Sequence, residues 1–176
     1  MTSIIPIKFI WMRCMDYTKM QELYEAVIPI QDLWNETTML TKYPNIMRGY
    51  IAHNINGDVI ACAVVGLLEK HNTMYIDCFT ISNTIRGNKF SYVAWNTFIE
   101  FVNNEWSEVN THKIIIEVYH KNIPIWAKVM NINILGIDEY VTKPKLFTDN
   151  SIMGSNLSHS EAIDVYSEWQ LIESNW

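Results

Sequence analysis

The amino-acid sequence predicts an α/β (α+β) fold with a mixed, mostly antiparallel sheet and helices on both faces. Three observations support this fold class. The composition is globular, with 49% hydrophobic and 18% charged residues. Two strand-like runs flank the turn-forming pair Asn56-Gly57, and strand-like and helix-like segments alternate after them. Since no repeat or Pro/Gly/Ser linker divides the 176 residues, we expect residues 1–176 to form a single domain.

The N-terminal segment is expected to hold one strand and two helices. Ile4–Trp11 is typical of a strand, and Pro6 places that part at an edge or a strand start. Asp16 is suited to cap a helix with one apolar face. That face consists of Met20, Leu23, Tyr24 and Val27. A shorter helix is expected over Gln31–Tyr43, because a proline stands on each side of it.

The middle of the chain carries the clearest local pattern. Arg48–Asn54 and Val59–Leu68 are strand-like, and Asn56-Gly57 accepts the positive φ values of a two-residue hairpin turn. A further strand is expected at Met74–Ile81. A loop over Ser82–Asn88 then leads into a helix with an apolar stripe. The stripe consists of Tyr92, Trp95, Phe98, Ile99 and Val102.

The C-terminal part begins with a strongly apolar strand, Lys113–Tyr119. A helix is expected from about Pro124 towards Asn131, because proline suits the first turn of a helix. Tyr140–Phe147 and Val165–Ile172 are predicted to be strands, with a polar loop through Gly154 and Ser158 between them.

Charge and residue usage narrow the classes of partner. A net charge of -6 at pH 7 and a pI near 5.3 argue against nucleic acid as the main partner, because binding phosphates needs clustered Lys and Arg. An acidic pocket would instead suit a small cationic acceptor. The five histidines show no two-ligand spacing, so no metal is expected. No Gly-x-Ser-x-Gly motif or Cys/His pairing indicates a covalent nucleophile.

The cysteines and the N-terminus favour a cytoplasmic protein. Cys14, Cys62 and Cys78 are an odd number and are read as buried free thiols in a reducing compartment. Met1–Met12 lacks the long apolar region of a signal peptide, and no stretch has the length of a membrane span. We therefore expect no membrane association, and the sequence leaves room for a homodimer.

The segment Ile81–Ser91 resembles the acyl-CoA-binding motif of the GNAT superfamily of acyltransferases. In that family a strand ends in Val-x-Pro, and an Arg/Gln-x-x-Gly-x-Gly/Ala loop then opens a helix. Ile81 stands in the place of the valine, Asn83 in that of the proline and Arg86 in that of the Arg/Gln. Backbone amides at a helix N-terminus present positive partial charge to a pyrophosphate, which gives the motif its physical basis.

A second similarity lies downstream. Val118–Asn122 fits the family's strand that ends in Val-x-x-x-Asn, and Leu135-Gly136-Ile137 is similar to the Gly-Phe that begins the following strand. With the hairpin, these features follow the family's order over residues 1 to 140. The resemblance implies acetyl-CoA or another short acyl-CoA as co-substrate. The implied binding residues are Phe79, Ile81, Arg86, Gly87, Asn88, Lys89, Phe90, Ser91 and Asn122.

The sequence departs from the family's pattern at three positions. Lys89 and Ser91 replace the two loop glycines. Lysine carries a Cβ where close approach is needed, although its ammonium can also reach a phosphate. The family's tyrosine general acid would fall at Val129, which cannot donate a proton.

Candidate catalytic residues follow from the same resemblance. Asp77 interrupts an apolar strand, where the family often places a carboxylate that takes the acceptor's proton. A buried carboxylate beside a pocket has a raised pKa, which suits a base near neutrality, while a solvent-facing one would have no such role. Glu117 is the weaker alternative base. Tyr119 and Tyr140 are candidates for the acid, because a phenol can protonate a departing thiolate.

The activity implied by the resemblance is direct transfer of an acetyl or other short acyl group from CoA to an amine of a small molecule or protein. Two other functions stay open. One is a GNAT-like binding or regulatory module without catalysis, motivated by Lys89 and Val129. The other is a GNAT-like enzyme with a different donor, such as those that modify nucleic-acid bases. Trp126 either packs in the core or flanks the pantetheine arm of the cofactor.

Overall fold

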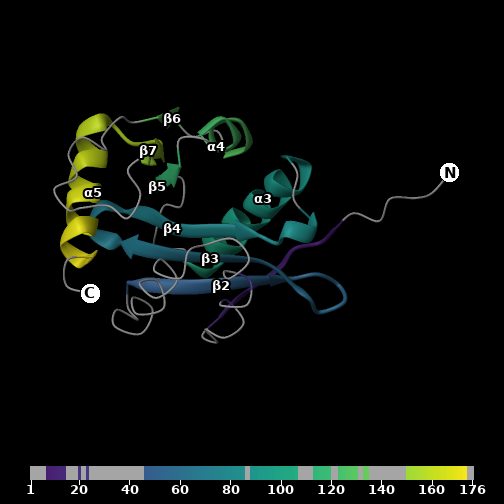
Figure 1. Ribbon diagram of the computed structural model, residues 1–176. Helices are drawn as coiled ribbons and strands as arrows, with labels where there is room; N and C mark the ends of the chain where they lie inside the picture. The colour runs from purple at the N-terminus through teal and green to yellow at the C-terminus, as the bar shows by residue number, and fades with distance from the viewer. Residues whose placement is uncertain are drawn as a thin grey trace.

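The computed structural model describes residues 7–14, 20, 23, 46–85, 88–106, 113–119, 123–130, 133–134 and 150–173. Within these residues seven strands form one sheet in the order β1-β2-β3-β4-β5-β7-β6 (Figure 1). The strands are β1 (Ile10–Arg13), β2 (Met47–His53), β3 (Val59–Leu68), β4 (Thr73–Ile81), β5 (Ile114–Tyr119), β6 (Asn133–Ile134) and β7 (Asn150–Ser155). The helices are α3 (Asn88–Glu105), α4 (Ile123–Met130) and α5 (His159–Glu173), with short 3₁₀ turns η1 (Glu69–His71) and η2 (Asn83–Ile85).

The sheet is mixed, and its pairings are antiparallel except for one. Among the described strands, only β4 and β5 run parallel to each other. A parallel pair needs a crossover connection, which α3 supplies between the two strands. This architecture confirms the predicted fold class.

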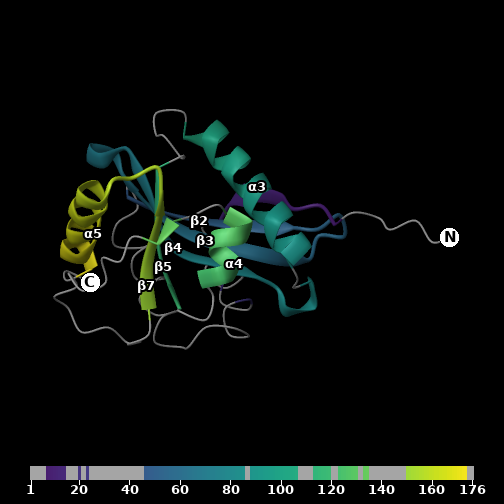
Figure 2. The same cartoon turned by 90° about the horizontal axis from the view of Figure 1, so that it is seen from above.

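Helices cover both faces of the sheet and bury two separate apolar clusters. One cluster joins the sheet to α3, where Trp95, Phe98 and Val102 are buried, and α4 packs against its margin. The other joins the opposite face to α5 through Val165, Tyr166 and Trp169. In both views β5 and β7 lie between α5 and α4 (Figure 2). The part of the sheet around the β4–β5 pair is therefore covered by α3 and α4 on one face and by α5 on the other.

The hairpin is formed by β2 and β3, as predicted, but its turn is larger than two residues. The Asn54 amide donates to the Asp58 carbonyl and the Gly57 amide donates to the Asn54 carbonyl, so residues 55–57 form the loop. Gly57 has a φ of 85°, a value that glycine adopts without steric cost. The Asn54 side chain also accepts from the Asp58 amide. This extra contact favours the longer loop over the predicted two-residue turn.

The N-terminal strand begins later in the described residues than predicted. β1 covers Ile10–Arg13 and pairs with β2, and residues 7–9 of the predicted strand Ile4–Trp11 are not strand, while residues 4–6 lie outside the described residues. Met20 and Leu23 are helical and buried, which fits the predicted helix face. The predicted helix at residues 31–43 lies outside the described residues. All three cysteines are free and buried, as expected.

The helix α3 follows the predicted stripe except at one residue. Trp95, Phe98 and Val102 are buried, and Ile99 packs at the edge of the cluster, but Tyr92 is 54% exposed. Its spacing of three residues from Trp95 is compatible with the apolar face, but the buried face of the helix begins at Ala94 and Trp95 and leaves Tyr92 outside. α4 matches the predicted helix. Tyr140–Phe147 and residues 135–137 lie outside the described part of the chain.

The C-terminal prediction of a strand at Val165–Ile172 is wrong, because this segment belongs to α5. The buried residues Ala162, Val165, Tyr166 and Trp169 recur at helical spacing, and Leu171 is exposed. The predicted polar loop through Gly154 is also wrong, since β7 runs over Asn150–Ser155 and pairs with β5.

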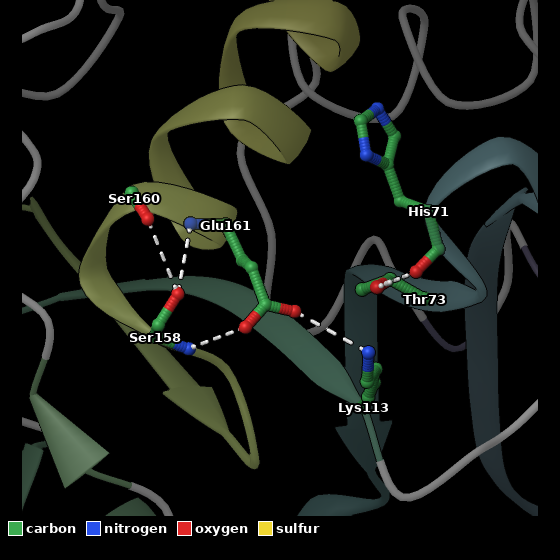
Figure 3. Close-up of polar contacts among 6 residues, drawn as sticks. All are labelled: His71, Thr73, Lys113, Ser158, Ser160 and Glu161. Atoms are coloured by element: carbon green, nitrogen blue, oxygen red, sulfur yellow. Dashed lines mark hydrogen bonds and ion pairs between the residues drawn. The ribbon is translucent and has the colours of Figure 1, made fainter.

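A capping box fixes the start of α5 (Figure 3). The Ser158 hydroxyl accepts from the Glu161 amide at 3.2 Å, and the Glu161 carboxylate accepts from the Ser158 amide at 3.3 Å. Both contacts satisfy amides that have no partner within the helix. Lys113, just before β5, donates to the same carboxylate at 3.3 Å. The cap thus also ties α5 to the sheet.

Aromatic stacking holds the body of α5 on the sheet. The Trp169 ring stacks on Tyr75 of β4 with centroids 4.2 Å apart. Its six-membered ring lies over Gly66 of β3, where an added Cβ would come within 2.1 Å of Cζ3. Gly66 is therefore required by close approach of the indole. His71 of η1 also contacts the carboxylate of Glu168 on α5.

Candidate functional site

The parallel pair β4–β5 opens into a fork. The two strands pair at Met74–Ile76 and Ile114–Ile116, and the ladder ends there. β4 continues to Ile81 and β5 to Tyr119 without further pairing between them. The fork is defined as the opening between residues 77–81 and residues 117–119. Backbone groups on its two inner edges are not used in a β4–β5 ladder.

Both arms of the fork are held by their outer neighbours. The β4 arm pairs with β3 as far as Ile81, opposite Ala61. The β5 arm pairs with β7 as far as Tyr119, opposite Asn150. The separation is therefore built into the sheet, since fraying strand ends would not keep these ladders.

A β-bulge in β4 marks the point where the fork opens. Val65 pairs with Ile76 and Val64 pairs with Cys78, which leaves Asp77 as the extra residue. Bulges bend and twist a strand locally, so this one accounts for the divergence of β4 from β5. The Asp77 side chain is half-buried, and its Oδ2 atom is buried. A carboxylate thus lies where the two strands part.

Three aromatic rings meet beside the β4 arm of the fork. Phe79 of the β4 arm packs edge-on against Trp95 of α3, with centroids 5.3 Å apart, and against Trp126 of α4, at 6.1 Å. Trp95 and Trp126 meet at 5.8 Å. Phe79 and Trp126 are only partly buried. Trp126 thus packs against the margin of the core, and its predicted alternative beside the pantetheine arm stays a prediction.

The β4 arm leads into the N-terminus of α3. The Ser82 amide donates to the Ile60 carbonyl at 2.8 Å, and the Ser82 hydroxyl contacts that of Thr84 at 3.0 Å. α3 then begins at Asn88, and Phe90 and Ser91 lie half-buried in its first turns. First-turn amides have no partner within a helix and attract anions. Among the described residues, the first turn of α3 is thus the first α-helical turn after the β4 arm.

The structure brings together several of the predicted site residues. Asp77, Phe79 and Ile81 lie on the β4 arm, and the backbone of Tyr119 lies on the β5 arm. Asn88, Lys89, Phe90 and Ser91 open α3. Arg86, Gly87, Asn122 and Tyr140 lie outside the described residues. The sequence analysis does not predict the bulge. The one sign of it in the sequence is an aspartate, Asp77, inside an otherwise apolar strand.

A second polar group lies at the other end of α3, away from the fork. Glu105 accepts from Arg48 at 2.8 Å and from the Tyr50 hydroxyl at 2.9 Å. Burial, together with the Glu105 charge, raises the pKa of the Tyr50 phenol well above its usual range. Arg48 also lies over the Trp106 ring at 4.2 Å. These contacts fasten α3 to β2 and do not reach the fork.

No family sequence model and no curated protein sequence matches this chain, but its fold is found in solved structures. The forked mixed sheet with its crossover helix is the GNAT superfamily fold. The chain is similar to a GNAT-family acetyltransferase from Staphylococcus aureus Mu50, with a TM-score of 0.61, 16% identity and coverage of 87% of this chain and 100% of that one. The predicted GNAT resemblance is therefore confirmed for the fold.

Two further solved structures share this fold. One is a Klebsiella pneumoniae protein assigned as an acyl-CoA N-acyltransferase, with a TM-score of 0.60, 13% identity and coverage of 84% of this chain and 96% of that one. The other is a dodecameric spermidine N-acetyltransferase from Vibrio cholerae, with a TM-score of 0.60, 12% identity and coverage of 88% and 95%.

No three His, Cys, Asp or Glu side chains in the described ranges gather as metal ligands would. None of the helices described here is long and apolar enough to cross a membrane.

Proposed function

We propose that this chain is an acyl-CoA-dependent N-acyltransferase that moves an acetyl or other short acyl group to an amine. The observation that carries the proposal is the fork, which opens at Asp77 and leads into the first turn of α3. The fork places backbone groups outside the β4–β5 ladder beside a thioester, and the helix start offers amides to a phosphate. The GNAT fold of the solved relatives supports the same reading.

In this proposal each predicted residue has a defined task. The amine's lone pair attacks the thioester carbonyl, and Asp77 takes the N–H proton. The C–S bond breaks, and the departing thiolate takes a proton from a phenol, for which Tyr119 and Tyr140 are the candidates. No acyl-enzyme is formed, because both substrates are bound side by side.

The binding residues are those implied by the resemblance. Arg86 and the amides of residues 87–91 would hold the pyrophosphate, with Lys89 as a further cation. Phe79, Ile81 and Asn122 would border the arm of the cofactor. Acetyl-CoA is the co-substrate we expect, and no metal takes part.

The acceptor is proposed to be an amine on a small molecule or a protein. The net charge of -6 favours a cationic acceptor over nucleic acid. Spermidine is a sensible member of a test panel, because the Vibrio cholerae relative is named for it. A cytoplasmic location and a homodimer remain predictions.

Thermal unfolding with acetyl-CoA tests the proposal. A ligand that binds only the folded state stabilises it by about 2.7 kcal/mol at a hundredfold excess over Kd, which raises Tm. No shift at saturating acetyl-CoA would overturn the proposal. A shift without CoA release from any amine in the panel would favour the binding module motivated by Lys89 and Val129. A shift only with other donors would favour a GNAT-like enzyme of different donor class.

A further inference from the structure

Two ion pairs connect α5 to the sheet. Lys113, just before β5, lies 3.3 Å from the Glu161 carboxylate, and His71 of η1 contacts the Glu168 carboxylate. Glu161 and Glu168 are seven residues apart, so they lie on the same side of α5 and about two turns from each other. The helix is thus held by one ion pair near its start and by another in its C-terminal half.

The two cationic residues are positioned at the same end of the sheet. The Thr73 hydroxyl donates to the His71 carbonyl at 2.9 Å, and the Met74 amide donates to the Lys113 carbonyl at 2.9 Å. Thr73 and Met74 are the first residues of β4. Figure 3 shows His71 and Lys113 on the sheet side of the interface with α5. Hydrogen bonds to the start of one strand therefore hold both partners of the helix.

The two pairs differ in their response to pH. An ammonium and a carboxylate both keep their charges between about pH 6 and about pH 8.5, whereas an imidazole loses its proton within this range. The neutral ring can still donate one hydrogen bond to a carboxylate, but the attraction between opposite charges is gone. The contact of His71 with Glu168 therefore weakens as pH rises over this range, and that of Lys113 with Glu161 does not.

The charges around His71 leave Glu168 as its partner. The other titratable side chains described on η1, on α5 and next to β5 are Glu69, Lys70, Lys113, His159, Glu161, Asp164 and Tyr166. Lys113 and Glu161 pair with each other. Within the described residues, the His71 ring forms its one charged contact with Glu168, and side-chain exposures of 20% and 34% shield this pair partly from solvent.

The His71–Glu168 pair lies next to the last buried contact of α5. Trp169 is fully buried and stacks on Tyr75 of β4, with centroids 4.2 Å apart. Beyond Trp169 no described side chain of the helix belongs to the buried core, and Leu171 is 67% exposed. Segments with few buried contacts open most readily. The ion pair therefore reinforces the part of α5 that has the fewest apolar contacts.

We infer that the His71–Glu168 pair is a pH-sensitive clamp, which holds the C-terminal half of α5, residues 166–173, on the sheet more firmly at about pH 6 than at about pH 8.5. The sign follows from the charges. The contribution of the clamp is present where the imidazole is protonated, and it is lost as the ring gives up its proton. Lys113 and the capping box hold residues 159–165 at both pH values. The clamp is independent of whether the chain binds acyl-CoA.

A double-mutant cycle at these two pH values tests the clamp. The equilibrium constant of urea unfolding is measured for wild type, His71→Gln, Glu168→Gln and the double variant. The coupling between the two substitutions should be about threefold at the lower pH and should fall towards one at the higher pH. The matched cycle of Lys113→Gln and Glu161→Gln should give the same factor at both pH values. His53→Gln, which changes a half-buried histidine of β2, should show no coupling to Glu168→Gln.

Hydrogen exchange locates the effect within the helix. After correction for the intrinsic exchange rate, amide protection in wild type should fall with rising pH about threefold more in residues 166–173 than in residues 159–165. In Glu168→Gln this excess should vanish. A coupling factor near one at the lower pH, or equal factors at the two pH values, would overturn the clamp. Equal loss of protection in both halves of α5 would overturn it as well. Should a variant fail to fold, the exchange of wild type alone decides.

Discussion

The two halves of β4 have opposite surroundings. Before the bulge, Tyr75 is 1% exposed and stacks beneath Trp169, and the strand pairs on both edges. After the bulge, Phe79 is partly buried, and the strand pairs with β3 but no longer with β5. One strand thus serves a closed interface with α5 and an open fork.

The difference predicts that stability depends on one half of β4 and the proposed chemistry on the other. The closed half satisfies its backbone and fills its volume, so substitutions there should lower the free energy of unfolding. The open half does not pair with β5 and carries a half-buried carboxylate, so substitutions there should change binding or rate.

Asp77→Asn should have the largest effect. If Asp77 is the base, the amide keeps its shape but cannot take a proton, and turnover should fall about 10²–10⁴-fold with acetyl-CoA affinity nearly unchanged. CoA release with an amine acceptor measures the rate, and calorimetry measures the affinity. Asp58→Asn in the exposed hairpin loop is the control. Undiminished turnover across pH would remove Asp77 from the mechanism, and a loss in Glu117→Gln would move the role to β5.

Gly66→Ala should be the most destabilising of the changes in the closed half. Its Cβ would lie 2.1 Å from Trp169 Cζ3, so the indole must shift, at a cost of about 3 kcal/mol. Urea unfolding measures the change. In the double variant with Trp169→Leu the clash is gone, so the two costs should be less than additive. A Gly66→Ala protein as stable as wild type would contradict the close packing of α5.

Lys89→Ala should weaken CoA binding if the ammonium contacts phosphate. A charge-assisted hydrogen bond is worth about 1.5–3 kcal/mol, and the loss should shrink as salt screens the contact. If the lysine instead obstructs the site, Lys89→Gly should improve binding, so the two substitutions give opposite signs. Calorimetric titration of acetyl-CoA reads both, with Lys128→Ala on α4 as control. Unchanged affinity in both variants would exclude either role.

Ser158→Ala should remove the cap of α5. The Glu161 amide loses its acceptor, and the free energy of unfolding should fall by about 1 kcal/mol. Ser160→Ala is a matched control in the same turn, and it should stay within about 0.5 kcal/mol of wild type. Acyl-CoA affinity should be unaffected in both, because α5 covers the face opposite α3 and α4. A loss of affinity would mean that the two halves of β4 are coupled.

The smallest effect concerns pH. The hydroxyl and amide of Ser158, followed by the Lys113 ammonium, lower the pKa of the Glu161 carboxyl. A carboxyl whose pKa is lowered by folding adds stability at pH values above its unfolded-state pKa. This added stability is lost as pH falls through the folded-state pKa. The stability difference between wild type and Glu161→Gln should therefore shrink as pH falls below about 4.5. The stability difference between wild type and Lys113→Ala should shrink less over the same pH range. A difference that grows in acid would contradict the cap geometry.

Segments with strong local patterns could be predicted from the sequence. The hairpin, α3, β5 and α4 were found because their apolar period and turn residues agree with the tertiary structure. α5 was missed although Ser158 and Glu161 form a capping box, because the run Val165–Ile172 was read without the helical spacing of Ala162. β7 was missed for another reason. Asn150–Ser155 is short and polar at its ends, and its pairing with β5 makes it a strand.

The site was predictable as a set of residues but not as a shape. Asp77 was singled out because a carboxylate interrupts an apolar strand. The alternation of apolar residues does not tell which face of the sheet Asp77 occupies. A bulge shifts that alternation by one residue, and a bulge exists only where the strand pairs with a neighbouring strand. The fork likewise depends on where β4 and β5 stop pairing, which is a contact between distant parts of the chain.

The bulge also makes Asp77 an insertion in an otherwise regular strand. Met74 and Ile76 pack on the α3/α4 side, but beyond Asp77 it is Phe79 and Ile81 that do so, so the alternation changes parity at one residue. Deleting Asp77 would restore regular alternation and keep Phe79 on the α3/α4 side and Cys78 on the α5 side. The shortened strand would still match both helix layers, but it would lose the carboxylate and the local bend at the point where β4 and β5 part.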